Sequence, residues 1–377
     1  MPPSFKNPLL EHRRAVIAAL QRPGEDVELL IDELRLLLAN LDIETAEVLI
    51  QKKGSPDPAR MLGAGKVAEL KRLATISKAD LVVFNNMLRP VQLSNLRKET
   101  DCEVWDRALV IMKIFEQRAT TAEAKLQVEL ARCRYEIPHL RGLGKQMSNA
   151  GAGIGTRGSG ETEFERHRRK LQSRVVEIRR KLAEIQKRRK NQRKQRKKNG
   201  LPVIAIVGYT NSGKTTLLRY LSGDTKLYAA DQLFATLDTV VRSIRMPTGE
   251  KFLMADTVGF IRELPPELMA AFRATLEEVC QADMLLVVLD LNDPDLPETY
   301  NVIQDQLLEI GAASLPRVVA LNKIDTAGTF KLERMKDHLS REGFPVCGIS
   351  AITGEGIEEL LSICHWVLRG SDSAKKE

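Results

Sequence analysis

The stretch at positions 208–215 decides the fold of the C-terminal half, and it reads Gly208-Tyr209-Thr210-Asn211-Ser212-Gly213-Lys214-Thr215. It has the spacing of a phosphate-binding loop. An apolar run at 202–207 precedes it and Thr216-Leu217-Leu218 follows, so we expect it to join a buried strand to a helix. Glycine lets backbone N–H groups point at phosphate oxygens, and the helix N-terminus attracts the same anion. A glycine-rich turn without a ligand is the alternative, and the motifs that follow argue against it.

Two side chains at the end of the loop suit a phosphate and a metal. Lys214 would reach the β and γ phosphates, and Thr215 would place its hydroxyl on Mg²⁺. Downstream, Asp256-Thr257-Val258-Gly259 follows the apolar run 252–255. Its carboxylate is therefore predicted to lie at a strand end and hold Mg²⁺ through water, while the Gly259 amide meets the γ-phosphate.

The tetrapeptide Asn322-Lys323-Ile324-Asp325 closes the apolar run 318–321 and predicts base selectivity. A carboxylate at Asp325 would accept hydrogen bonds from the two donors of guanine, at N1 and N2. Adenine lacks both donors, so ATP would leave the carboxylate unsatisfied at a cost of about 1–3 kcal/mol per group. Ser350-Ala351 follows the mostly apolar segment 345–349 and is expected to support the base through backbone N–H groups. These motifs favour GTP over ATP.

A short, polar-flanked segment at 231–238 lies where a mobile switch belongs. We expect its second half to contact the nucleotide, through Phe234, Ala235, Thr236, Leu237 and Asp238. Thr236 is predicted to be the second hydroxyl ligand of Mg²⁺, with threonines 225, 239 and 248 as alternatives. We assign catalysis to three residues, Lys214, Thr236 and Gly259, and metal binding to Thr215, Thr236 and Asp256.

Phe260 occupies the position where many GTPases have a glutamine that orients the attacking water. A phenyl ring cannot orient water, so we predict slow hydrolysis by the isolated chain and acceleration by a partner. Asn211 suggests a second idea, because an amide at this loop position is similar to that of GTPases in which a bound K⁺ supplies positive charge. Equal hydrolysis rates in K⁺ and Na⁺ would exclude it.

Beyond these motifs, several stretches resemble the HflX family of ribosome-associated GTPases. In the C-terminal half they are 256–261, Leu264-Pro265 and 271–278, and upstream they are 127–131 and 153–163. The resemblance implies a factor that binds the large ribosomal subunit in its GTP form and separates stalled ribosomes into subunits under stress, with hydrolysis resetting it. A ribosome-assembly GTPase is an alternative. A third hypothesis is an RNA-remodelling protein with an additional ATP site in its N-terminal domain.

Composition fits a multidomain protein of the cytoplasm. A length of 377 residues predicts two or three domains, and 43% hydrophobic residues suffice for their cores. The apolar runs are too short to span a membrane, and charged residues interrupt any N-terminal signal segment. Five cysteines without CxxC spacing argue against a disulfide framework or a zinc site and favour a reducing cytosol. We expect a monomer.

The first 115 residues alternate strand-like and helix-like patterns. Strands are expected at 46–50 and 81–84, a helix at 66–74 and a further apolar element at 108–114. These predict a small α/β domain with a parallel sheet. Gly63-Ala64-Gly65-Lys66 invites a second nucleotide site, but a tight turn before a helix is the better interpretation because the full loop spacing is missing.

From Phe115 to Ile137 apolar residues recur every three or four positions, and Pro138 is expected to end this helix. A second helix has an apolar stripe from Phe164 to Ile185, so the two predict an antiparallel hairpin. Its connector, 140–160, holds seven glycines and three basic residues. It is either a disordered linker or a tip that approaches RNA closely, and the family resemblance implies the second.

A basic run at 187–198 holds nine Lys or Arg and no acid. Without those nine, the formal charge of the chain falls from +8 to −1, so the basicity is local. A solvated helix face is the ordinary interpretation, but so one-sided a run repels itself unless a polyanion is near. RNA phosphates would bind it with steep salt dependence, and an acidic membrane surface would attract it weakly.

The predicted fold class is α/β: a P-loop GTPase domain preceded by a small α/β domain and an antiparallel helical hairpin. We divide the chain into an N-terminal domain at 1–115, a hairpin with its glycine-rich tip and basic run at 116–200, a G domain at 201–370 and a charged tail at 371–377. The predicted partners are GTP or GDP and the RNA of the large ribosomal subunit.

Overall fold

A computed structural model describes residues 13–149, 159–198, 201–224, 233–234, 240–246, 248–262, 268 and 278–374. Within its helices, side chains are not described at 141–149, 159–164, 190, 192–198 and 371–374. The chain divides into two compact units, and the boundary falls between Ala183 and Glu184 of one long helix. Each unit has its own sheet.

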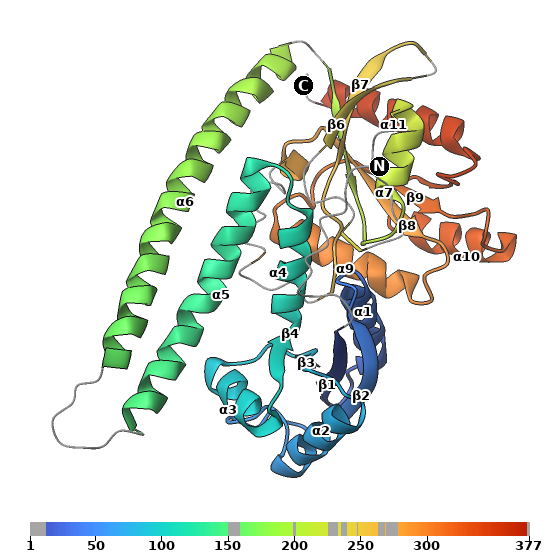
Figure 1. Ribbon diagram of the computed structural model, residues 1–377. Coiled ribbons are helices and arrows are strands. Elements are labelled where there is room, and N and C mark those ends of the chain that lie inside the picture. The colour runs from blue at the N-terminus through green and yellow to red at the C-terminus, as the bar shows by residue number, and fades with distance from the viewer. Residues whose placement is uncertain are drawn as a thin grey trace. The chain divides into compact units, whose positions relative to one another are not determined.

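The sheet of the first unit has four strands in the order β2-β1-β3-β4, and every neighbouring pair is parallel (Figure 1). The strands are β1 (Arg14–Gln21), β2 (Glu44–Lys52), β3 (Leu81–Phe84) and β4 (Glu103–Asp106). Six consecutive residues of β1 and all four of β3 are buried, as expected of central parallel strands that are covered on both faces. The expected parallel sheet is confirmed.

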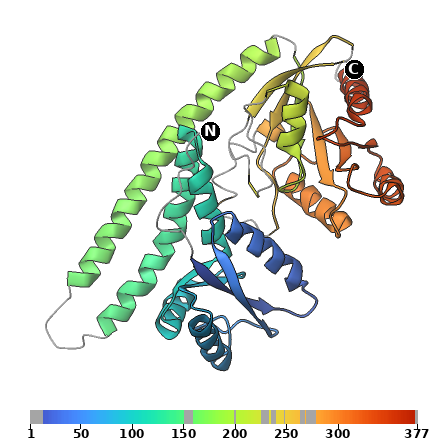
Figure 2. The ribbon, with the colours of Figure 1, turned by 45° about the vertical axis from the view of Figure 1, so that its right-hand side comes forward.

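Four helices connect and cover these strands: α1 (Val27–Ala39), α2 (Ala64–Ile76), α3 (Pro90–Thr100) and α4 (Arg107–Arg118). Helix α1 packs beside α4 and α2 beside α3, so one pair covers each face of the sheet (Figure 2). Gly63 is the N-cap residue of α2, and its N–H donates to the Gln51 side chain at 2.8 Å. The glycines at 63 and 65 therefore mark a helix start, as expected.

The next two helices, α5 (Ala122–Asn149) and α6 (Ser159–Lys198), lie side by side and antiparallel where α6 belongs to the first unit (Figures 1 and 2). Their apolar stripes meet: residues of α5 (Leu126, Leu130, Cys133 and Ile137) pack against residues of α6 (Leu171, Val175, Ile178 and Leu182). The predicted hairpin is confirmed, and the heptad-like spacing explains its seam.

Three details of the predicted hairpin were wrong. Phe115 belongs to α4, because the chain leaves the helix at Ala119 before α5 begins. Helix α5 continues through Pro138 to Asn149, and the packing of Ile137 against α6 stabilises it beyond the residue that lacks an N–H. The helices therefore include both ends of the predicted connector, while the glycines at 151, 153, 155 and 158 lie outside the described residues.

The second unit contains a six-stranded sheet in the order β10-β9-β8-β5-β7-β6. Its strands are β5 (Val203–Val207), β6 (Val240–Arg245), β7 (Lys251–Asp256), β8 (Met284–Asp290), β9 (Arg317–Asn322) and β10 (Val346–Gly348). Only β6 pairs in antiparallel fashion, with β7. Among the described residues of this unit, the helices that follow strands are α7 (Lys214–Ser222), α9 (Leu296–Glu309), α10 (Thr329–Ser340) and α11 (Ile357–Ala374). This is the expected P-loop fold, with β5 at its centre.

None of the helices, over the residues described, combines the length and the apolar character that a membrane crossing requires.

The first unit buries a charged pair between α1 and α4. Arg107, 1% exposed, donates to the Glu33 carboxylate, to Asn85 Oδ1 at 3.1 Å and to the Leu30 carbonyl at 3.3 Å. Such a network joins two helices on one face of the sheet. Its cost is the desolvation of both charges, which their mutual attraction and these hydrogen bonds offset.

We predict that Glu33→Ala destabilises this unit by about 3–5 kcal/mol, because a buried guanidinium loses its carboxylate. The double change Glu33→Leu with Arg107→Met should cost less, since it removes both charges together. Urea unfolding followed by circular dichroism would compare the midpoints. A double variant less stable than Glu33→Ala would contradict the prediction.

Candidate nucleotide site

The phosphate-binding loop leaves the carboxyl end of the central strand β5, where ligands bind in open α/β sheets. Helix α7 begins at Lys214 directly after it. Both glycines are required by close approaches. A Cβ at Gly208 would lie 2.2 Å from the Val288 carbonyl oxygen, and one at Gly213 (φ +94°) would lie 2.1 Å from Asn322 Nδ2. The loop is therefore packed against the ends of β8 and β9.

Lys214 lies inside the loop with 6% of its surface exposed. Its Nζ donates to the Tyr209 carbonyl at 2.6 Å. Burial lowers the pKa of Lys214 to about 8, and the charge of Asp256 opposes this shift. A Cβ added at Gly259 would lie 3.0 Å from this Nζ, so the structure brings Lys214 and Gly259 together.

The predicted metal ligands Thr215 and Asp256 also meet. Thr215 Oγ1 donates to Asp256 Oδ2 at 2.7 Å, and Asp256 is fully buried at the end of β7. The register of β7 explains the meeting, because Asp256 pairs with Ile206 on β5 just before the loop. Thr257 donates to the Ile206 carbonyl at 2.7 Å and fixes the turn that follows.

The chain after Gly259 pairs with the phosphate-binding loop. Phe260 donates its N–H to the Gly208 carbonyl at 3.0 Å and accepts from the Thr210 N–H at 2.8 Å, which makes a parallel bridge beside Tyr209. The Phe260 side chain is 5% exposed. An apolar ring thus occupies the interior at the position where a glutamine would orient water.

Asn322 joins the phosphate end of the site to the expected base end. Its Nδ2 donates to the Ser212 carbonyl at 2.8 Å, and its Oδ1 accepts from the Ala351 N–H at 2.9 Å. Asn322 is 2% exposed. One side-chain amide therefore sets the distance between the phosphate-binding loop and the Ser350-Ala351 loop.

The remaining base motif forms a compact turn. Ile324 N–H donates to the Ile349 carbonyl at 3.3 Å, and the fully buried Ser350 accepts from the Thr353 N–H at 3.1 Å. Asp325, the predicted acceptor for guanine, is exposed. The structure thus groups the motif beside the loop that holds Ala351.

Asp290 contacts the predicted base motif and was not predicted from the sequence. Lys323 Nζ lies 2.7 Å from Asp290 Oδ2, which fixes the lysine side chain beside the base motif. The signal was present, because Asp290 ends an apolar strand as Asp256 and Asn322 do. Polar residues at the carboxyl ends of parallel strands meet at one edge of the sheet.

Most of the predicted switch residues lie outside the part of the chain that the structure describes. Ala235, Thr236, Leu237 and Asp238 lie outside the described residues, as do the alternative threonines 225 and 239, while Thr248 lies in the turn between β6 and β7. Phe234 is buried with a left-handed backbone (φ +58°), and Val258 is also buried. Asn211 is exposed on the loop with φ +63°.

Two buried hydroxyl groups of the loop are suited to bind a polar ligand. Thr210 Oγ1 and Ser212 Oγ are buried and have no hydrogen-bond partner among the described residues. Buried hydroxyls are rarely left in this way. A polar ligand in the loop is the natural partner.

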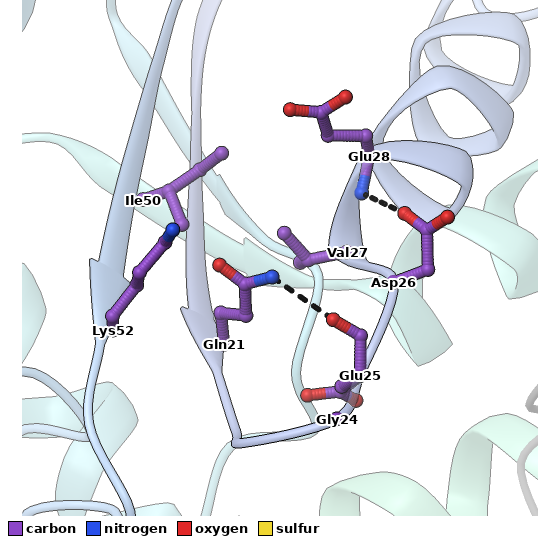
Figure 3. A pocket seen from close by; sticks show the side chains of 8 residues that line it. All are labelled: Gln21, Gly24, Glu25, Asp26, Val27, Glu28, Ile50 and Lys52. Carbon is purple, nitrogen blue, oxygen red and sulfur yellow. Dashed lines mark hydrogen bonds between the residues drawn. The ribbon is translucent and has the colours of Figure 1, made fainter.

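The first unit has a separate pocket of about 580 Å³ beyond the carboxyl ends of β1 and β2 (Figure 3). Gln21 Nε2 donates to the Glu25 carbonyl at 2.9 Å, and Glu28 N–H donates to Asp26 Oδ1 at 3.1 Å. Its charged lining is three carboxylates and one ammonium, Glu25, Asp26, Glu28 and Lys52. The pocket is therefore net acidic.

Three family models match consecutive parts of the chain. The model described as GTP-binding GTPase N-terminal matches residues 28–116, and the one described as GTP-binding GTPase Middle Region matches 118–196. The model described as 50S ribosome-binding GTPase matches 203–323. Together they cover nearly all of the chain from residue 28 to residue 323, which includes the hairpin and leaves out β1.

Curated relatives and a solved structure are similar along most of their length. GTPase HflX of Caldanaerobacter subterraneus is 45% identical over 84% of this chain and 73% of that protein. GTPase HflX of Escherichia coli is 38% identical over 88% of this chain and 77% of that protein. The crystal structure of the SsGBP and GDP complex covers 95% of this chain and 99% of that one, with 27% identity and a TM-score of 0.53. Sequence identity of 38–45% over most of this chain and of each relative confirms the resemblance, and the chain belongs to the HflX family of GTPases.

Proposed function

We propose that this GTPase binds the large ribosomal subunit in its GTP form and dissociates stalled ribosomes into subunits, and that hydrolysis resets it. The observation that carries the proposal is the meeting of Lys214, Asp256 and Asn322 around one loop. That loop lies in the domain matched by the 50S ribosome-binding GTPase model. The geometry supports GTP chemistry, and the family model supports the ribosome as the partner.

In this proposal the loop from Gly208 to Thr215 holds the phosphates. Its backbone N–H groups surround them, and the hydroxyls of Thr210 and Ser212 gain a polar ligand nearby. Lys214 would turn from the Tyr209 carbonyl toward the β and γ phosphates. Because the pKa of Lys214 is lowered by burial, a polyanion would raise it again by supplying negative charge.

The residues present fit Mg²⁺. Thr215 and Asp256 offer a hydroxyl and a carboxylate 2.7 Å apart, and Mg²⁺ prefers such oxygen donors. The described parts of the chain hold no cluster of three His, Cys, Asp or Glu side chains that could cage a metal. This suits an ion that takes most of its ligands from phosphate and water, with Thr236 as the further protein ligand. When bound, Mg²⁺ would neutralise charge that develops on the phosphates.

Base selection falls to the motif beside Asn322. Asp325 would accept from N1 and N2 of guanine, and Lys323 would lie along the ring. The N–H groups of Ser350 and Ala351 donate to the Glu355 carbonyl and to Asn322 Oδ1, so one of them would have to leave its partner to meet the base oxygen. The Asp290 carboxylate supports this arrangement because it holds Lys323 in place.

Hydrolysis by the isolated chain should be slow, since the buried Phe260 cannot orient water. The Gly259 amide would stabilise the γ-phosphate, and the ribosome would supply the missing order. Bound K⁺ at the exposed Asn211 remains a hypothesis that the comparison of K⁺ with Na⁺ decides.

The helical hairpin is the part we assign to ribosomal RNA. The basic run forms the C-terminal end of α6. Phosphate contacts would release counterions there and give steep salt dependence. Weak attraction to an acidic membrane surface would follow from the same charge. We further propose that the protein works as a monomer in the cytoplasm.

An ATP-driven remodelling activity has less support. Lys66, the lysine of the glycine-containing segment before α2, pairs with Glu69 at 2.8 Å. The pocket of Figure 3 is lined by three carboxylates, which would repel a triphosphate.

Subunit release tests the main proposal against ribosome assembly. Intact ribosomes with the protein and a non-hydrolysable GTP analogue should separate into subunits on sucrose gradients. Lys214→Ala should abolish release because the triphosphate loses its lysine, while Lys251→Ala, at the exposed start of β7, should not. Co-migration with immature particles alone, without subunit release, would support assembly instead.

The lowered pKa of Lys214 predicts pH-dependent nucleotide affinity. Below pH 8 the lysine is charged in both the free and the bound protein, so affinity is flat. Above pH 8 the Lys214 amine of the free protein must take up a proton before GDP binds, so the Kd for GDP should rise about tenfold from pH 7 to pH 9. Lys214→Arg, which stays charged, should bind with a flat profile. Titrations with fluorescent GDP measure the Kd at each pH. An equal dependence of the Kd on pH in the wild type and in Lys214→Arg would contradict the prediction.

Asp325→Asn should exchange the base preference. An amide donates to the carbonyl at position 2 of xanthine but loses the two guanine contacts, so GTP binding should weaken about 10- to 100-fold while xanthosine triphosphate gains. Competition against fluorescent GDP ranks the nucleotides. Asp337→Asn, an exposed change on α10, is the matched control. An unchanged preference in Asp325→Asn would place the base elsewhere.

A further inference from the structure

Tyr209, the second residue of the phosphate-binding loop, makes a long-range contact through its phenol. Tyr209 Oη accepts a hydrogen bond from the Arg262 N–H at 2.8 Å, across 53 positions of sequence. Its carbonyl accepts from Lys214 Nζ at 2.6 Å. One residue thus touches both the phosphate lysine and the chain that follows Asp256-Thr257-Val258-Gly259.

The same short segment, 260–262, is bound along the loop at its other end. Phe260 exchanges two backbone hydrogen bonds with the residues on either side of Tyr209, at 3.0 and 2.8 Å. The phenol adds a third bond two residues later. Residues 260–262 therefore lie on the loop as a short added strand.

The side of this segment away from the loop is held by residues that follow β8. Gln306 Nε2 donates to the Ile261 carbonyl at 2.9 Å, and the Arg262 guanidinium donates to Asp295 Oδ2 at 3.2 Å. These anchors position the segment relative to α9. The Tyr209 phenol and the Phe260 bridge position the segment relative to the phosphate-binding loop.

Gly259 directly precedes the anchored segment and has little room. A Cβ there would lie 2.9 Å from Thr210 Cα and 3.0 Å from Lys214 Nζ. A small rotation of residues 260–262 would therefore move the Gly259 peptide group relative to Lys214. The orientation of this amide depends on how firmly the following residues are held.

We infer that Tyr209 is a positioning residue whose phenol fixes residues 260–262 and thereby aims the Gly259 amide at the γ-phosphate. The inference rests on the proposed function, in which that amide contacts the γ-phosphate. Because GDP has no γ-phosphate, the phenol matters for the triphosphate and for its hydrolysis, and not for the diphosphate.

Tyr209→Phe keeps the ring and removes the acceptor oxygen. Affinity for a non-hydrolysable GTP analogue and kcat for GTP, measured without ribosomes, should each fall about fivefold, the ratio that corresponds to one hydrogen bond of about 1 kcal/mol. Affinity for GDP should stay at the wild-type value, and the Tm should fall by no more than about 2–4 °C, the shift that corresponds to one such hydrogen bond. Ser362→Ala, which removes an exposed hydroxyl that donates to the Glu358 carbonyl of its own helix α11, is the control and should change none of these.

Equal losses for GDP and the analogue, with a larger fall in the Tm, would show a structural role in the loop and overturn the inference. Wild-type values for every measurement would overturn it as well. Wild-type protein that binds neither nucleotide would overturn the proposed function itself, so the two failures are distinguishable.

Discussion

The Asn322 side-chain amide, which bonds the Ser212 carbonyl and the Ala351 N–H, is the constraint on which the site depends. Its two partners lie on the loops that follow β5 and β10, while Asn322 itself ends β9. An amide holds its donor nitrogen and its acceptor oxygen in fixed geometry, so it sets the spacing between the two loops as well as joining them. Gly213 has no Cβ because the amide occupies that space.

Near Asn322 the domain buries two charged groups, Lys214 and Asp256, beside the loop where the phosphates of a nucleotide are expected to bind. The loop closes over Lys214 and depresses the pKa of its ammonium. Asp256, fully buried beside Thr215, has the opposite charge and limits the shift. These charges are already close together before phosphate arrives, so that only the Lys214 side chain has to turn from the Tyr209 carbonyl, and they cost stability that the scaffold of the sheet must supply.

The site was largely predictable from sequence because its motifs mark strand ends. Lys214, Asp256 and Asn322 follow apolar runs at defined spacing, and parallel strands bring their ends together. Their assigned contacts with nucleotide stay predictions. The contact of Tyr209 with Arg262 was not predictable, since a tyrosine hydroxyl carries no sign of a partner 53 positions away.

The fold was predictable in class and less so in detail. Strand β1 escaped notice although its six apolar residues suit a covered strand, because short apolar runs do not distinguish strand from helix. The prediction that Pro138 ends the helix was wrong because it considered only the local effect of proline on the backbone. Packing against α6, which the sequence does not reveal, stabilises α5 beyond this residue. Asp290 and Lys323 show the same limit, since only the sheet brings them together.

Helix α6 continues well past Leu182, the last residue of its apolar seam, into the basic run at 187–198. Like charges at i and i+4 disfavour winding by a few tenths of a kcal/mol per pair, and no apolar stripe compensates for them there. Coil and helix are therefore closely balanced in this terminal stretch, and added salt shifts the balance toward helix by screening. Charge neutralisation and helical winding therefore become one thermodynamic event in this stretch.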